Sequence, residues 1–489
     1  MTRYATDVIV VGAGGAGMMA AMAAADVGAS VLHLEKMPRI GGIWGYLGGT
    51  AAGAQTRMQL EAGLLGDSSY LYFADCMREE KARKYCDPEV LMYFCQHAGA
   101  AVDWLDAAGA FEGTDRRPIA GVKGETWSVP RAYPLVARPL LAAVRPEYQK
   151  RLDKGSIVLR TGTRVTRLLV SAGRVAGLAA RTAEAREINY RARAIVICTG
   201  GFAGSMAMVR KYNHPNATDV ILGAPAFDKG EGLVMCEEAG ALLVNLDHAV
   251  VAGPTAGGVP DPTHPGKQIA YVSPNRHRGI IWLDATGRRV INEDCGSTSA
   301  RLRDALNGAP GQTLTLVFDS KVRAEREPLF TSRHNLTPAR SWEWFDEKAQ
   351  EGVIIKRTST LEALATALGM NAATVKETVA AYNLAVEVGQ DGQFNRRELD
   401  WKIQSPPFYG IKTGCAVVNS SGGPATNVRQ QVLDTTGRVI PGLYAAGEVA
   451  GYQACGTAMF NIGNIVFGRQ AGRMAALEAK QLRWRRERS

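Results

Sequence analysis

The stretch DVIVVGAGGAG, residues 7–17, decides the fold of this 489-residue chain. Its apolar half predicts a buried parallel strand, and its glycines follow at G-x-G-x-x-G spacing. Each glycine has its own physical reason. Gly12 permits a tight turn, Gly14 lets the backbone approach a pyrophosphate, and Gly17 lets a helix pack closely on the strand. The spacing therefore predicts a strand, a tight turn and the start of a helix.

The residues that follow complete a β-α-β unit. Residues 18–27 are rich in Ala and Met and contain no breaker, so they predict a helix that Gly28 ends. Residues 30–34 predict a second apolar strand, and Glu35 at its end can accept a hydrogen bond from a ribose hydroxyl. The N–H groups at the helix N-terminus favour phosphate. Because all these parts fall in register, we predict a dinucleotide-binding site.

A second glycine-rich loop indicates which dinucleotide binds. Residues 36–53 read KMPRIGGIWGYLGGTAAG. Such a loop suits a flavin, because bare backbone must approach the ribityl chain and the flat ring system. Here the chain resembles the FAD-dependent fumarate reductase and 3-ketosteroid dehydrogenase superfamily, whose members carry E-K-x-P-x-x-G-G at this place. The resemblance implies an α/β protein with a discontinuous Rossmann-type FAD-binding domain and an inserted α+β capping domain.

Two later motifs strengthen the resemblance. Residues 194–202 read AIVICTGGF, which is similar to the family's apolar strand that ends in a Gly-Gly turn beside the flavin nucleotide. Residues 438–448 read RVIPGLYAAGE, an apolar strand whose final acid, Glu448, can bond the ribityl hydroxyls. The predicted helix 463–476 could direct its positive N-terminus at the flavin's pyrimidine end.

The resemblance covers nearly the whole chain and implies three segments. We expect the first part of the FAD-binding domain over residues 1–248, the capping domain over 249–398 and the rest of the FAD-binding domain over 399–489. The residues that the resemblance implies for FAD binding are Gly12, Gly14, Gly15, Ala16, Gly17, Glu35, Lys36, Gly41, Gly42, Gly48, Gly49, Val165, Thr199, Gly200, Gly201, Glu231, Gly447, Glu448, Asn464 and Ile465. Residues 41–53 contain no His for covalent attachment, so we expect FAD to be bound non-covalently.

The composition is that of an ordinary globular protein with a basic balance. The chain is 46% hydrophobic and 21% charged, and its net charge is +10. Part of that charge lies in RWRRER, residues 483–488, and no basic stripe with interleaved aromatic residues occurs elsewhere, so we expect no nucleic-acid partner. No apolar run reaches the ~20 residues of a membrane span. Because the cofactor strand begins at Asp7, we also expect no signal peptide.

The eight cysteines of the chain include no C-x-x-C pair. This spacing gives no support for zinc, iron–sulfur or c-type haem sites, so we predict no metal site. Several of the cysteines lie in apolar runs, as small core residues do. We therefore expect reduced thiols and a cytoplasmic location.

The chain departs from the fumarate reductases where they bind a dicarboxylate. The family's His-His-Thr-Met-Gly-Gly reads VNSSGG over residues 418–423, its Arg before the last helix is replaced by Gly456, and its acid Arg falls on Ser297. A buried carboxylate needs a cationic or bidentate donor. These losses together favour a neutral cyclic or aromatic substrate, such as a steroid enone, a cyclic ketone or an isoflavonoid like tetrahydrodaidzein. The two tyrosines of the steroid dehydrogenases are also missing, since they align with Ser297 and Cys455.

The resemblance implies hydride transfer at flavin N5, with a side chain that handles a proton. The candidates for that side chain are Arg303, Tyr452, Ser297 and Asn419, each of which can equally be a structural residue. The sequence contains no haem or FMN-carrier domain, so electrons should pass to or from a separate donor or acceptor. Two alternatives stay open: a dicarboxylate reductase, and a flavoprotein subunit that passes electrons to an iron–sulfur or quinone partner.

Overall fold

The computed structural model describes residues 3–45, 49–78, 80–119, 127–135, 140–213, 220–222, 224–247, 249–252, 259–260, 268–272, 279–295, 305, 308–324, 330–332, 338–420, 422–452 and 459–488. The chain divides into two compact units. The first comprises Met1–Phe202, Pro225–Ala249 and Ser420–Ser489, and the second comprises Ala203–Ala224 and Val250–Asn419. The domain boundaries at 248/249 and 398/399 stay a prediction.

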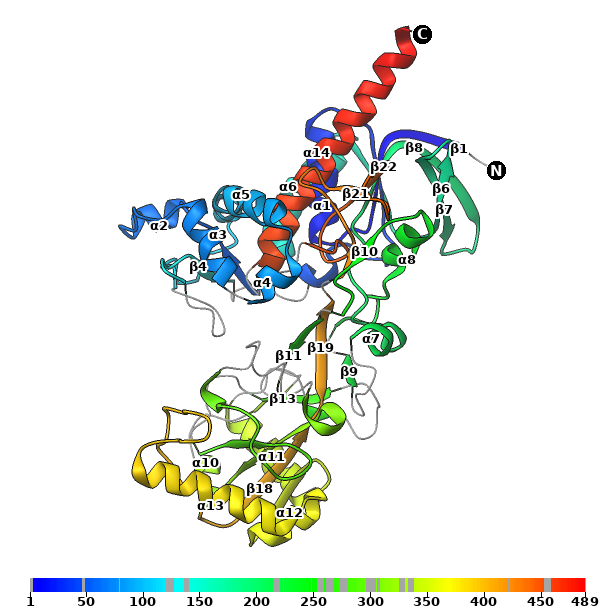
Figure 1. Cartoon of the computed structure of the whole chain (residues 1–489). Helices are drawn as coiled ribbons and strands as arrows, with labels where there is room; N and C mark the ends of the chain where they lie inside the picture. The colour runs from blue at the N-terminus through cyan, green and yellow to red at the C-terminus, as the bar shows by residue number, and fades with distance from the viewer. Residues whose placement is uncertain are drawn as a thin grey trace. The chain divides into compact units, whose positions relative to one another are not determined.

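A mainly parallel sheet lies at the centre of the first unit (Figure 1). Its strand order is β21-β22-β8-β1-β2-β5, and β7 joins β6 to β8 by antiparallel pairing. The strands are β1 (Arg3–Val11), β2 (Val31–Leu34), β5 (Ile157–Arg160), β6 (Thr163–Ser171), β7 (Arg174–Thr182), β8 (Glu187–Ile197), β21 (Gln431–Leu433) and β22 (Val439–Ala445). Parallel pairing of β1 with both β2 and β8 confirms the predicted β-α-β unit.

Strand β1 is buried on both faces, as a parallel strand between covered faces must be. Val8 and Val10 belong to one core cluster, whereas Ile9 and Val11 belong to another. Alternate residues of a strand point to opposite faces, so a continuous apolar run serves both cores.

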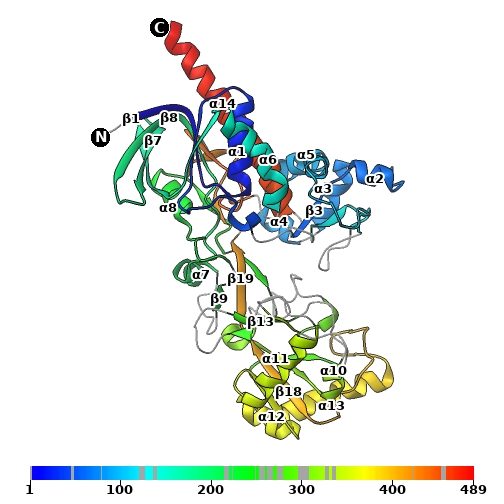
Figure 2. The same ribbon diagram turned by 180° about the vertical axis from the view of Figure 1, so that it is seen from behind.

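The first unit also contains several helices. They are α1 (Gly15–Asp26), α2 (Arg57–Glu61), α3 (Ser69–Arg78), α4 (Glu80–Tyr85), α5 (Pro88–Ala107), α6 (Leu140–Asp153), α8 (Glu231–Glu238) and α14 (Met459–Arg488). Helix α14 lies alongside α1 (Figures 1 and 2). The two helices approach closely because Gly468 and Gly472 of α14 face the backbone of α1, where a Cβ on Gly472 would overlap the Ala20 carbonyl oxygen.

Short elements complete the first unit. They are the 3-10 turn η1 (Gly42–Gly45), the strand pair β3 (Gly49–Ala52) and β4 (Ala132–Leu135), and the strand pair β10 (Leu243–Val244) and β20 (Gly423–Pro424). Strand β3 contains residues 49–52 of the glycine-rich loop, and its pairing with β4 holds that part of the loop in place.

The second unit contains a four-stranded antiparallel sheet in the order β14-β15-β18-β17. Helices α12 and α13 supply part of the core that packs on this sheet. The helices and strands that belong mainly to this unit are α7 (Met206–Tyr212), β9 (Val220–Leu222), β11 (Ala249–Ala252), β12 (Val259–Pro260), β13 (Gln268–Val272), β14 (Ile281–Leu283), η2 (Glu293–Cys295), η3 (Pro310–Gln312), β15 (Leu314–Phe318), α10 (Ser320–Arg323), β16 (Phe330–Ser332), α11 (Pro338–Glu351), β17 (Ile355–Thr358), α12 (Leu361–Leu368), α13 (Ala372–Val388), β18 (Phe408–Thr413) and β19 (Cys415–Ser420).

Candidate FAD site and active site

The turn between β1 and α1 is so tight that two of its glycines are sterically required. Gly12 has φ of +96°, and a Cβ there would meet the carbonyl oxygen of Cys198 on the neighbouring strand. A Cβ on Gly17 would overlap the carbonyl oxygen of Gly12. Both positions therefore exclude any side chain, which is the role that the spacing assigned to them.

Gly14 has a different environment, which fits a pyrophosphate. Among the described residues, a Cβ on Gly14 would meet nothing within 4 Å and no side chain caps the α1 N-terminus, whose first turn carries no acid. The first helical hydrogen bond runs from the Met18 N–H to the Gly14 oxygen at 3.0 Å. The N–H groups before it have no partner inside the helix and carry the positive end of its dipole. Open space beside these donors suits a dinucleotide phosphate.

The second glycine-rich loop lies against this turn. The Gly41 N–H donates to the Ala13 oxygen at 2.7 Å, and a Cβ on Gly42 would lie 3.2 Å from the Gly14 Cα. Trp44 follows in η1, where its indole ring lies where a Cβ of Gly15 would stand. The structure thus brings the two predicted glycine segments together. Gly48 lies outside the described residues, and Gly49 begins β3.

Asn461 ties this loop to α14, and the sequence interpretation missed it as a site residue. Its Oδ1 accepts from the Trp44 indole N–H at 3.0 Å, and its Nδ2 donates to the Thr50 oxygen at 3.2 Å. The indole of Trp44 is only 1% exposed, so the bond satisfies a buried donor. Asn461 therefore bonds the glycine-rich loop at two points, Trp44 and Thr50.

Glu35 lies at the end of β2, where both of its carboxylate oxygens accept backbone hydrogen bonds. The Ala13 N–H donates to Oε2 at 2.6 Å and the Met37 N–H donates to Oε1 at 2.8 Å. Each carboxylate oxygen can accept a further bond, so a ribose contact is compatible with this arrangement. Val165 lies in the adjoining β6, which the Thr163 N–H links to the Glu35 carbonyl at 2.8 Å.

Lys36 and Glu231 form an ion pair at the start of α8, and Arg164 adds a second cation to the Glu231 carboxylate at 2.6 Å. Nearby, Gly232 packs against the side chain of Thr199. The Thr199 hydroxyl is buried and has no hydrogen-bond partner among the described residues. Such an orphaned group is expected where a bound cofactor would complete the bonding.

Glu448 and Gly201 meet around Ser420. The Ser420 N–H donates to Glu448 at 2.9 Å, and the Ser420 hydroxyl oxygen accepts from the Phe202 N–H at 2.8 Å. A Cβ on Gly201 would overlap that hydroxyl, so the Gly200–Gly201 turn must stay bare.

Gly447 lies against the start of α1. A Cβ on Gly447 would lie 2.8 Å from the Ala16 Cβ and 2.9 Å from the Asn464 Oδ1. Ile465, the next predicted residue on α14, is buried in the core. The structure therefore gathers the predicted residues of both chain ends around the N-terminus of α1, and their roles toward FAD stay predictions.

Two of the four candidate proton-handling residues, Ser297 and Arg303, lie outside the described residues. Tyr452 is half-buried in the first unit and packs against its core; burial, followed by the nearby Asp87 carboxylate, raises its pKa. Asn419 is half-buried on β19 and belongs to the second unit. Their catalytic roles stay predictions.

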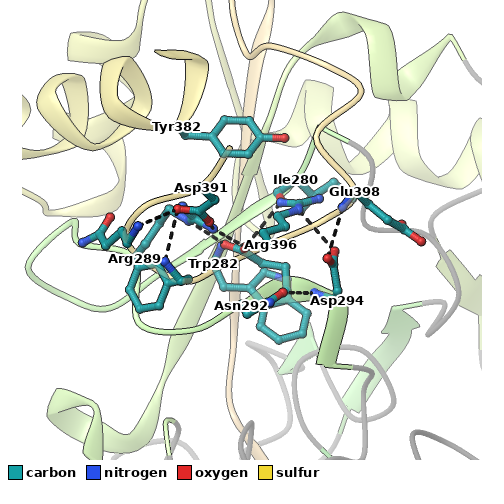
Figure 3. A network of polar contacts seen from close by, with 12 residues as sticks. Ile280, Trp282, Arg289, Asn292, Asp294, Tyr382, Asp391, Arg396 and Glu398 are labelled. Atoms are coloured by element: carbon teal, nitrogen blue, oxygen red, sulfur yellow. Dashed lines mark hydrogen bonds and ion pairs between the residues drawn. The ribbon is translucent and has the colours of Figure 1, made fainter. Parts of the chain in front are cut away.

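A buried network of ions holds the residues that precede Ser297 (Figure 3). Arg289 bonds Glu293 at 2.6 Å and Asp391 at 3.0 Å, and Arg396 reaches Glu293 at 3.3 Å. Because Arg289 and Glu293 are bonded to each other and to Asp391 and Arg396, the network fixes Glu293 at the start of η2. The sequence interpretation did not foresee it, since Asp391 and Arg396 lie about a hundred residues later.

The cysteines agree with the expectation of reduced thiols at four described positions and differ from it at Cys86. Cys76, Cys95, Cys198 and Cys236 are free and buried, and burial raises the pKa of Cys198 and of Cys236 to about 12. Cys86 is disulfide-bonded. Disulfides persist mainly in oxidising compartments, so the cytoplasmic location stays a prediction.

Neither a metal centre nor a membrane helix is found in the part of the chain that the structure describes. No group of three or more His, Cys, Asp or Glu side chains there could hold a metal ion. No helix there is long and apolar enough to cross a membrane.

Comparison with known proteins identifies the family of this chain. The model of the FAD binding domain family matches residues 7–459. The chain is 31% identical over 485 residues to a fumarate reductase (cytochrome) of Shewanella frigidimarina, covering 97% of this chain and 78% of the relative. This chain belongs to the fumarate reductase family of FAD-binding oxidoreductases. Its cofactor is FAD, which fits the open α1 N-terminus and the bare glycine turns.

A solved structure and a longer relative extend the comparison. A flavocytochrome c3 fumarate reductase in an open conformation superposes with a TM-score of 0.73 at 26% identity, covering 97% of this chain and 79% of that one. The NADH:fumarate oxidoreductase of Klebsiella pneumoniae is 30% identical over 97% of this chain, which spans only 48% of that relative. The chain thus corresponds to about half of some relatives.

Other family members are named for different substrates. The vinyl phenol reductase of Lactiplantibacillus plantarum is 27% identical, covering 91% of this chain and 90% of the relative. The 3-oxosteroid 1-dehydrogenase of Mycobacterium tuberculosis is 26% identical, covering 92% of this chain and 94% of the relative. Membership in the family therefore leaves the substrate open.

Proposed function

We propose that this protein uses non-covalently bound FAD to reduce or desaturate a carbon–carbon bond in a neutral cyclic or aromatic substrate. The observation that carries the proposal is the segment 418–420, which reads Val-Asn-Ser where fumarate reductases of this type carry His-His-Thr. In this segment the Ser420 hydroxyl and N–H are occupied by Phe202 and Glu448. In this segment we assign the contact with the substrate to the uncharged side-chain amide of Asn419.

The energetic argument favours a neutral ligand. Each dicarboxylate charge that leaves water without a fixed cation costs several kcal/mol. A planar apolar ring gains about 25 cal/mol per Å² of buried apolar surface. With Ser297 and Gly456 at the two remaining anchor positions, charge complementarity to a dicarboxylate is lost at each matched position.

FAD, when bound, supplies hydride transfer at N5. The turn around Gly14, together with Glu35 and Glu448, would hold it. Tyr452 is a candidate proton donor because its half-buried phenol carries an O–H that is protonated at physiological pH. Asn419 can orient a carbonyl or hydroxyl but cannot exchange a proton, so we assign it substrate orientation. Ser297 and Arg303 are the further candidates.

The names of two relatives support a neutral substrate, because vinyl phenol and 3-oxosteroids are ring compounds without a carboxylate. Steroid enones, cyclic ketones and isoflavonoids such as tetrahydrodaidzein form the panel that we propose. The relatives named for cytochrome and NADH support a separate electron donor or acceptor for this chain.

A dicarboxylate substrate is the second candidate. It is favoured by the 30–31% identity to fumarate reductases and by Arg301 and Arg303, which lie four and six residues beyond Ser297. Either guanidinium could take the place of a missing anchor if it faces the substrate. A role as a subunit that feeds an iron–sulfur or quinone partner is tested by co-purification.

Anaerobic titration of the FAD spectrum distinguishes the two candidates. Androstenedione, cyclohexenone and tetrahydrodaidzein are added separately to the oxidised protein, and fumarate and succinate serve as the charged set. We expect at least one ring compound to shift the flavin bands and the dicarboxylates to leave them unchanged. Asn419→Ala should weaken that shift, whereas Asn427→Ala, which removes an amide of the β20–β21 connection, should not. A shift with fumarate alone would overturn the proposal.

A further inference from the structure

We propose that His33 and Tyr148 act as positioning residues that hold the Gly12–Ala13 peptide in the orientation required for FAD binding. His33 is completely buried on β2 and Tyr148 is completely buried on α6. The inference rests on FAD binding, which family membership establishes, and does not depend on the proposed substrate.

The contacts of His33 define its protonation. Its Nε2 lies 3.0 Å from the Gly12 carbonyl oxygen and its Nδ1 lies 2.7 Å from the Tyr148 hydroxyl. A carbonyl oxygen can only accept, so Nε2 must carry the hydrogen. Burial lowers the pKa of His33 to about 4, which keeps the ring neutral. Nδ1 is then an acceptor, and Tyr148 donates to it.

Glu35, the residue directly after β2, completes the arrangement. Its Oε2 accepts from the Ala13 N–H at 2.6 Å, so the same peptide is bonded at its carbonyl by His33 and at its N–H by Glu35. His33 lies on β2 and Glu35 directly follows that strand. Two side chains from this short segment thus hold both polar ends of the Gly12–Ala13 peptide.

A glycine turn needs such support. Gly12 has φ of +96°, a region that glycine enters freely and also leaves freely. The Gly12 oxygen is also packed against Gly17, so a rotated peptide would press on the first turn of α1. Since the N–H groups of that turn are the predicted phosphate donors, the orientation of this one peptide would set their direction.

The position of His33 itself indicates a role. Strand β2 is buried at every residue, and a strand covered on both faces is normally apolar throughout. A buried imidazole destabilises the fold unless both of its nitrogens have hydrogen-bond partners. Both nitrogens of His33 have such partners. The ring of Tyr148 meets that of His33 edge-on, with 5.7 Å between centroids and planes at 78°, so packing fixes the pair as well.

The test uses the apo-protein and FAD itself. The dissociation constant is measured by quenching of FAD fluorescence for wild type, His33→Leu, His33→Gln and Tyr148→Phe, and apo-protein melting is recorded for each. His33→Leu should raise the constant on the order of tenfold or more, as loss of a buried hydrogen bond implies. His33→Gln carries an amide N–H near the place of Nε2, so it should recover most of the affinity. His97→Gln, on the exposed side of α5, is the matched control and should bind like wild type.

A spectroscopic readout keeps the test independent of folding. In ¹⁵N-histidine-labelled wild type, the His33 signal, identified by its absence from His33→Gln, should show a protonated Nε2 and an unprotonated Nδ1. Tyr148→Phe should shift that Nδ1 resonance. A protonated Nδ1 in the wild type would overturn the proposal. So would a His33→Leu protein that folds and binds FAD with unchanged affinity. Neither outcome would bear on the substrate.

Discussion

Glu35 bonds two backbone N–H groups in addition to its expected ribose contact, so its loss should act on the turn and on the cofactor together. We predict that Glu35→Ala weakens FAD binding on the order of a hundredfold, because two buried bonds to a charged acceptor disappear. The FAD affinity of Glu35→Gln, whose amide oxygen still accepts one bond, should lie between the affinities of wild type and Glu35→Ala. Titration of the apo-proteins with FAD measures this order, and equal affinities would exclude Glu35 as a ligand or support.

The buried His33 makes stability depend on pH. Its pKa of about 4 in the fold lies below the 6.5 of the unfolded chain, so the unfolded state binds more protons between these values. Stability should therefore decline as the pH falls through this window, by about 2–3 kcal/mol at pH 4.5. Urea unfolding at pH 7.0, 5.5 and 4.5 should show a steeper decline for wild type than for His33→Gln. Parallel curves would contradict the assigned environment.

Cys86 is expected to differ chemically from the four free cysteines. Peptide mapping without reductant should recover it in a disulfide-linked peptide and identify its partner. Cys198 and Cys236 should stay unmodified by iodoacetamide in the folded protein, because their raised pKa leaves almost no thiolate. Recovery of Cys86 as a free, alkylated thiol from protein prepared under air would refute this prediction.

At the level of elements, the close contact of α1 and α14 is the feature most sensitive to a single methyl group. Gly472→Ala would place a Cβ on the Ala20 backbone, and overpacking of this kind costs about 1–3 kcal/mol. Gly392→Ala is the matched control, since a Cβ there meets nothing within 4 Å. Thermal melting should show a clearly lower melting temperature for Gly472→Ala and almost no change for Gly392→Ala. Equal melting temperatures would mean that the helices separate easily.

The elements around the turn could be predicted from sequence, because strand, glycine and helix patterns are local. The Gly12 and Gly17 constraints follow directly from spacing. The support of the turn could not be predicted in the same way. Asn461 bonds Trp44 across 417 positions of sequence, and His33 occurs within a stretch that reads as an ordinary apolar strand. Such pairs carry no periodic signal, since only the fold brings their polar atoms together.

Longer-range ion networks show the same limit. Arg131 is completely buried, where Asp67 and Asp75 each approach it at 2.6 Å, and this trio braces β4 beside the glycine-rich loop. The charge of Arg131 is neutralised inside the protein by two carboxylates that lie 64 and 56 positions earlier in the sequence. Composition gives the charges, but only the structure shows which of them are paired.

For the whole molecule, the attachment of FAD is the first property to test. The glycine-rich loop offers no His, so acid precipitation should release FAD into the supernatant and leave a colourless pellet. Yellow colour retained by the washed, denatured pellet would demonstrate a covalent bond and refute the prediction.

The central claim concerns the charge of the substrate, and turnover of the chemically reduced holoenzyme tests it most directly. Reoxidation of the flavin is followed anaerobically after mixing with fumarate or with each member of the ring panel, for wild type and for Arg303→Ala. We predict reoxidation by a neutral ring compound, none by fumarate, and little change on substitution of Arg303. Rapid reoxidation by fumarate that disappears in Arg303→Ala would contradict the account and assign Arg303 as the proton donor of a dicarboxylate reductase.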